Sequence, residues 1–210
     1  RGAAAGGPVA AEIVSEWEYD GTCRVEMTLK PAGGKPARLD ALRLVIPFTA
    51  GGAVSYMANG LNMRLSNQAG LIPESGAPAR QAGVSNTIPA AGPGGAVWRS
   101  TSIEHQPMTA GSFVPFVWVG NLKSGLAWFA DNDRGWWPSD KRAAVEIVRD
   151  DEGRASLVLN IASEPVEFAG PRRIVFGLNV NPVRPYSDHK GSRHTFGFLK
   201  ETGRWDGTTL

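Results

Sequence analysis

Apolar and polar side chains alternate with a period of two along most of this chain, which is the pattern of half-buried β-strands. In the segment 23–29 every second residue is apolar, and the residues between them are Arg24, Glu26 and Thr28. The chain also contains 26 glycines and 15 prolines, which favour turns over helices. The one helix candidate, 139–148, ends in β-branched residues and is interpreted as a strand. This pattern predicts a chain built almost entirely of strands.

Strands are predicted at 12–19, 23–29, 38–48, 113–119, 126–130, 144–149, 155–161 and 173–181. Asp20-Gly21 marks a tight turn, so the first two strands should form a hairpin. The strand 38–48 becomes apolar on both faces, and we expect it to be central in its sheet. The strand 173–181 has one small and polar face, which faces either solvent or a ligand groove: Val175, Gly177, Asn179 and Asn181. The predicted fold is mainly β, an antiparallel β-sandwich of roughly ten or more strands with long irregular loops and little helix.

The patterned region is predicted to be one sandwich domain over 12–185. A flexible N-terminal segment is expected at 1–11, and a C-terminal tail at 186–210 that leads to a missing domain. A glycine- and proline-rich loop at about 66–96 is either a surface excursion or a cover for a ligand or a neighbouring domain. Because the chain starts at Arg1, we expect a piece of something longer.

Composition argues against several classes of protein. The net charge is only +2, and basic residues never run longer than pairs, so no nucleic-acid partner is expected. No stretch approaches 18 apolar residues, so no membrane span is expected. With Cys23 as the single cysteine and only three histidines, neither a disulfide framework nor a zinc site is expected. No cofactor motif is present, and the sequence predicts neither a metal ligand nor a cofactor.

The segment from Trp128 to Pro138 is the densest candidate site, because it combines tryptophans, carboxylates, an amide and an arginine. A flat indole suits the C–H face of a sugar, and charged groups beside it suit the hydroxyls. The predicted carbohydrate or domain contacts are Asp131, Asp133, Arg134, Trp136 and Trp137. Trp118 and Trp128 are secondary candidates, because residues inside apolar runs are more often part of the core.

The two carboxylates of this segment also permit a catalytic interpretation. On an extended strand Asp131 and Asp133 would point to the same side, about 6.5 Å apart, a spacing that glycosidases use. Glycosidases place one carboxyl group on each side of the scissile bond, and two groups from the same strand end fit this requirement poorly. No catalytic residue is therefore predicted. A calcium site between Asp131 and Asp140 stays open, although the closing Glu of an EF-hand is missing.

Several segments resemble, in order, a known bacterial family: Glu18–Leu29, Leu42–Phe48, Pro115–Gly120, Gly125–Ala130, Asp133–Trp136, Val175–Leu178 and Asn181–Pro185. They are similar to the N-terminal region of glycoside hydrolase family 123 and its largely uncharacterised relatives. The resemblance implies a β-sandwich that precedes a catalytic (β/α)8 barrel, with the catalytic Asp-Glu pair on the barrel. It implies that only the Asp133–Trp136 loop carries over, as a wall near the barrel mouth.

Three functional hypotheses follow. The first, implied by the resemblance, is a non-catalytic module of an exported, periplasmic or extracellular, carbohydrate-active protein, whose partners are carbohydrate and the C-terminal barrel. It would pack on the barrel or extend its substrate site, and it predicts an exposed apolar patch. The second is an autonomous carbohydrate-binding module, which predicts an open groove with a solvent-facing Trp. The third is an independent glycosidase that uses Asp131 and Asp133, which predicts a deep cleft between them.

Overall fold

The computed structural model describes residues 2–49, 51–60, 67–71, 95–103, 109–121, 123–150 and 154–182. These residues form antiparallel sheets and two single-turn 3-10 helices, η1 (Ala32–Gly34) and η2 (Ser100–Ser102). The predicted mainly-β sandwich with little helix is therefore confirmed. Within these ranges, no helix has the length and apolar character that crossing a membrane requires.

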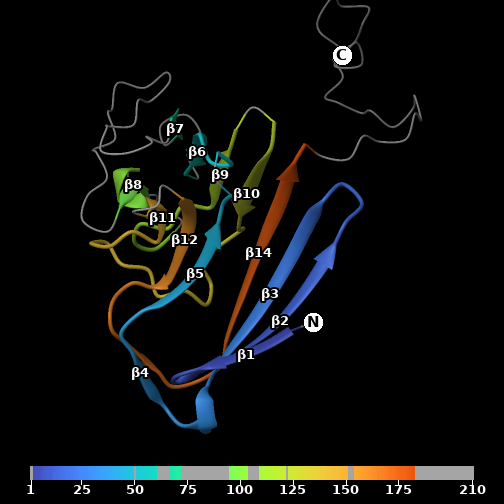
Figure 1. The fold of residues 1–210 in the computed structure, drawn as a ribbon. Coiled ribbons are helices and arrows are strands. Elements are labelled where there is room, and N and C mark those ends of the chain that lie inside the picture. Colours follow the sequence, from blue (N-terminus) through green and yellow to red (C-terminus); the bar gives the residue numbers. More distant parts are fainter. Residues whose placement is uncertain are drawn as a thin grey trace, which may run out of the picture.

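The larger sheet has eight strands in the spatial order β1-β2-β3-β14-β10-β9-β6-β7. Figure 1 shows β2, β3 and β14 as long neighbouring strands, with the shorter β9 and β6 further along the sheet. Their bounds are β1 (Gly2–Gly6), β2 (Val9–Trp17), β3 (Thr22–Pro31), β6 (Ser55–Asn59), β7 (Asn67–Leu71), β9 (Phe116–Gly120), β10 (Gly125–Phe129) and β14 (Arg172–Asn181). The predicted hairpin is present, because β2 pairs with β3 around a turn in which Asp20 Oδ1 accepts a hydrogen bond from the Thr22 backbone N–H.

The smaller sheet has the order β5-β12-β11-β8, and a separate pair joins β13 to β4. The bounds are β4 (Ala37–Leu39), β5 (Leu42–Pro47), β8 (Ala96–Arg99), β11 (Val145–Arg149), β12 (Ala155–Ala162) and β13 (Val166–Phe168). The apolar inner faces of the two main sheets pack together to form one core. Trp98 of β8 meets Tyr56 of β6 across that core, with ring centroids 5.8 Å apart. The alternation in β3 determines which residues face this core, as predicted: Cys23, Val25, Met27 and Leu29 are buried.

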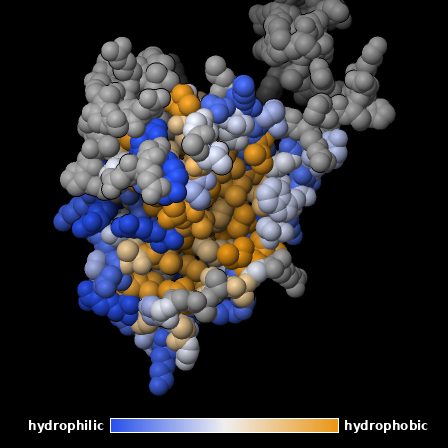
Figure 2. All heavy atoms as spheres, viewed as in Figure 1, coloured by the Kyte–Doolittle hydropathy of each residue, from blue (hydrophilic) through white to orange (hydrophobic). Residues whose placement is uncertain are grey.

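The sandwich is not fully closed on the side of β5. Figure 2 shows an apolar area in the middle of this face of the molecule, in the part of the view where Figure 1 draws β5 beside β14 and β3. Ile13 of β2 and Leu44 and Ile46 of β5 pack against the core but stay only partly buried. Val180, on the inner face of β14, is 43% exposed. The partly buried side chains Ile13, Leu44 and Ile46 are called the open edge below.

Three sequence predictions need correction. Residues 2–11, expected to be a flexible segment, form β1 and the start of β2. The strand 38–48 is interrupted after Leu39, and its second part, β5, is an edge strand rather than a central one. The irregular loop 66–96 contains β7 and the first residue of β8, while 72–94 and the tail 186–210 lie outside the described residues.

Candidate functional site

The loop that follows β10 is folded back on the molecule and is not extended. Asp133 Oδ2 accepts a hydrogen bond of 2.7 Å from the Ala110 backbone N–H, and the Trp136 backbone N–H donates to the Asp133 carbonyl. Gly135 has φ +88°, and a Cβ there would collide with the Arg173 carbonyl of β14. Because the chain turns here, the extended geometry assumed for Asp131 and Asp133 is wrong.

The tryptophans of this loop face the protein. Trp136 is only 4% exposed, and its ring lies 5.1 Å from Phe113 and 5.9 Å from Trp128, measured between centroids. Trp137 is half-buried, with the Arg172 guanidinium 4.0 Å over its ring and the Phe168 ring edge-on to it. Neither indole is presented as an open stacking face.

Among the polar members of the loop, Asp131, Asn132 and Arg134 are exposed, and Asp133 is partly buried. Asp131 lines a small cavity of about 210 Å³ beside Arg24 and Phe129, and Asp133 is not among the residues that line it. Arg134 is exposed, and its backbone N–H donates to Asn132 Oδ1 within the turn. In the described part of the chain no three acidic, histidine or cysteine side chains gather as a metal site would require.

A different surface combines the features expected of a sugar site, on the outward face of the larger sheet. Neighbouring strands bring Phe116 and Trp118 of β9, Phe129 of β10, and Asn179 and Asn181 of β14 onto this face. With Met57 of β6 and Ala127, they line an open groove of about 670 Å³. We call these seven side chains the aromatic platform.

Glycines hold the rings of the platform against the sheet. Trp118 lies across Gly120 and Gly125, because a Cβ on either glycine would come within 2.6 Å of its indole. The tip of the Phe129 ring lies across Gly177, its cross-strand partner on β14, in the same way. Because these three positions are glycines, the two aromatic rings have room to lie on the sheet surface.

A chain of polar groups runs along one border of the platform. The Trp118 indole Nε1–H donates to Asn181 Oδ1 at 3.0 Å, and Asn181 Nδ2 lies 3.5 Å from Asn179 Oδ1. Asn179 Nδ2 in turn donates to Thr22 Oγ1 at 2.7 Å. Each amide has two N–H donors and an oxygen with two lone pairs, so these contacts leave hydrogen-bonding capacity for a ligand.

The sequence predictions found this surface only in part. The small polar face of 173–181 is predicted to face either solvent or a groove, and Asn179 and Asn181 line a groove. Trp128 is completely buried, which fits its interpretation as core and not its place as a secondary contact candidate. Trp118 is half-buried on the outer face, so its interpretation as core is wrong, and its role as a contact stays a prediction. The sequence analysis does not identify Phe116 and Phe129. Because β9 and β10 are apolar on both faces, periodicity alone cannot distinguish their outer face from their inner face.

No protein-family model, curated protein or solved structure matches the chain.

Proposed function

We propose that this chain is a non-catalytic β-sandwich module that binds carbohydrate on the aromatic platform. The observation that carries the proposal is Trp118, whose indole is held on the outside of the sheet by Gly120, Gly125 and Asn181 while it borders an open groove. A sugar ring has an apolar C–H face and a rim of hydroxyls. An aromatic ring that is supported on one face by the sheet and bordered by polar groups suits both of these features. The resemblance to glycoside hydrolase family 123 points to the same class of ligand.

The side chains of the platform also indicate the kind of saccharide. None of its seven members is charged, so the groove offers stacking and neutral hydrogen bonds only. Asn179 and Asn181 can donate to and accept from hydroxyl groups, which have the same dual capacity. We therefore expect a neutral oligosaccharide. Catalysis by Asp131 and Asp133 finds no support, because Asp133 is not among the residues that line the cavity beside Asp131.

The test is a calorimetric titration of the chain with a panel of neutral oligosaccharides, amino sugars included. Trp118→Ala should weaken binding about tenfold or more, since truncation of a central aromatic contact commonly costs over 1 kcal/mol. Trp17→Ala is the matched control, because Trp17 is 66% exposed but lies outside the platform. Equal affinities for Trp118→Ala and the wild type, or no binding across the panel, would overturn the proposal.

A second candidate function, packing against another domain, is favoured by the open edge. Partly covered side chains such as Leu44 and Ile46 of an edge strand are typical of a surface that another unit covers. The measurement is hydrogen exchange in β5 and β14, in this chain alone and in any longer natural form of it. Protection that increases in the longer form supports docking, and identical exchange argues against it.

A further inference from the structure

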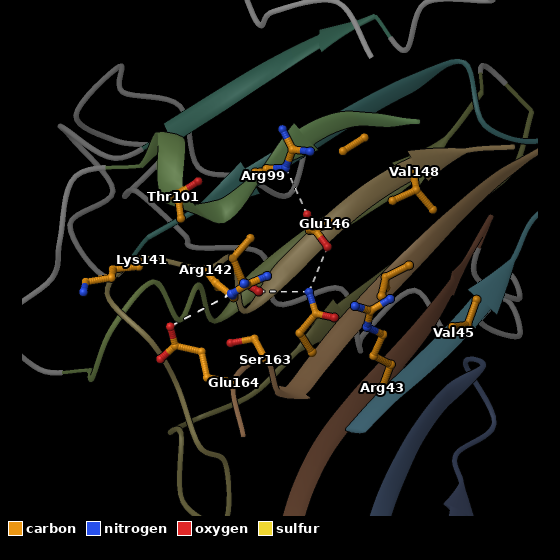
Figure 3. A pocket seen from close by; sticks show the side chains of 14 residues that line it. Arg43, Val45, Arg99, Thr101, Lys141, Arg142, Glu146, Val148, Ser163 and Glu164 are labelled. Atoms are coloured by element: carbon orange, nitrogen blue, oxygen red, sulfur yellow. Dashed lines mark hydrogen bonds and ion pairs between the residues drawn. The ribbon is translucent and has the colours of Figure 1, made fainter. Parts of the chain in front are cut away.

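A second cavity, of about 790 Å³, lies on the outward face of the smaller sheet. Figure 3 shows side chains from several strands of this sheet converging on it. Val45 of β5, Val158 of β12 and Val148 of β11 provide apolar lining. Because this face and the aromatic platform belong to different sheets of the sandwich, with the core between them, the two surfaces share no residue.

The cavity carries an excess of positive charge. Four cations line it, Arg43, Arg99, Lys141 and Arg142, against the two carboxylates Glu146 and Glu164. Glu146 is paired with Arg99 at 3.0 Å, and Glu164 lies 4.0 Å from Arg142. Figure 3 shows these two pairs joined by dashed lines, whereas none reaches Arg43. Among the described residues no carboxylate forms an ion pair with Arg43 or Lys141, so both cations are available to an anion.

Asn160 adds a requirement for a hydrogen-bond donor. The side chain is 4% exposed and lines the cavity, and its Nδ2 donates to the Ala143 carbonyl and to Glu146 Oε2, both at 2.9 Å. Both partners are acceptors, so the orientation of the amide is determined. The remaining Oδ1 is buried and has no hydrogen-bond partner. The Oγ of Ser163, another residue of the lining, is likewise buried and has no partner. Buried acceptors without a donor are uncommon in folded proteins.

Together these groups call for a ligand with two kinds of polar group. A carboxylate or sulfate would pair with Arg43, from which Figure 3 places Lys141 on the opposite side of the cavity, but such an anion cannot donate to Asn160. A hydroxyl group can, and the valines would contact an apolar C–H face. We propose that this cavity is a second binding site, for an acidic saccharide. The anionic character follows from the cavity itself, whereas the choice of a saccharide rests on the proposed function.

The test uses calorimetry at low salt with an oligosaccharide of uronic acids and its neutral counterpart. Arg43→Gln should weaken binding of the acidic ligand about tenfold, because a charge-assisted hydrogen bond is lost, and should leave neutral binding unchanged. Lys35→Gln is the control, since it removes the same charge from an exposed site outside the cavity. Trp118→Ala should show the reverse pattern, with neutral binding weakened and acidic binding kept.

The other results overturn the inference in distinguishable ways. Loss of acidic binding in Trp118→Ala but not in Arg43→Gln would place the acidic saccharide on the platform. If acetate or inorganic sulfate binds as tightly as the oligosaccharide, the cavity is a simple anion site and the choice of a saccharide is wrong. No acidic binding, with neutral binding intact, refutes the second site alone, and a chain that binds neither ligand refutes the proposed function as well.

Discussion

At the scale of single residues, absent side chains shape the aromatic platform as much as the side chains that are present. Gly177 on β14 is opposite Phe129 on β10, and the tip of the Phe129 ring occupies the space in which a Cβ would stand. The three nearest atoms to that Cβ position all belong to the Phe129 side chain and none to the backbone. A substitution there would therefore act on the ring and not on the strand.

Gly177→Ala should displace the Phe129 ring from the sheet and weaken saccharide binding several-fold. The cost in stability should be that of mild overpacking, about 1–3 kcal/mol. Gly170→Ala is the control, because a Cβ at Gly170 meets nothing within 4 Å. Titration of both variants, with denaturant unfolding in parallel, checks the prediction. Unchanged affinity in Gly177→Ala would show that the position of Phe129 does not matter for binding.

At the scale of elements, a charged network joins β3 to β14 on the outer face of the larger sheet. Arg173 Nε and a terminal nitrogen of its guanidinium each donate to Glu26 at 2.6 Å, and Arg24 donates to Glu26 at 3.1 Å. The hydrogen bonds from Arg173, followed by the one from Arg24, lower the pKa of the Glu26 carboxyl to about 2 from an ordinary value of 4.5. A two-pronged contact of this kind contributes more than a single exposed ion pair.

The pH dependence follows from the direction of that pKa shift. Because the folded pKa lies below the unfolded one, the stabilisation is complete above about pH 4.5 and is lost as the pH falls towards 2. Glu26→Gln should lower the Tm at neutral pH, and its difference from the wild type should shrink through that window. Thermal unfolding from pH 7 to 2.5 measures this. Glu12→Gln, which removes an exposed pair with Lys30, is the control, and a pH-independent difference for Glu26→Gln contradicts the assignment.

The elements also show how far the sequence could be interpreted. Alternation placed the strands and identified the buried face of β3, because a half-buried strand has one apolar side. It could not give the order of strands, because pairing is set by contacts distant in the sequence. For this reason β5, with apolar residues on both faces, was expected to be central, whereas it is an edge strand. The loop after β10 was misinterpreted for a related reason, because its contacts with Ala110 and Arg173 are distant in the sequence.

At the scale of the whole molecule, the two proposed binding surfaces depend on one core. The platform belongs to the larger sheet and the charged cavity to the smaller one. Between them, the buried ring of Trp98 in the smaller sheet packs against Tyr56 of the larger sheet. Trp98 is 1% exposed and is among the largest fully buried side chains of the described core. If this core is shared, loss of Trp98 should weaken both sheets together, although it lies in neither site.

Trp98→Ala should therefore lower the free energy of unfolding by about 3–5 kcal/mol, the usual cost of removing a large aromatic ring from a core. The unfolding transition should stay single, since neither sheet can bury its apolar face alone. Hydrogen exchange at neutral pH separates the possibilities, with β12 reporting on the smaller sheet and β14 on the larger. Equal acceleration in both strands is expected, whereas acceleration confined to β12 would mean that the larger sheet, with its aromatic platform, is stable without its partner.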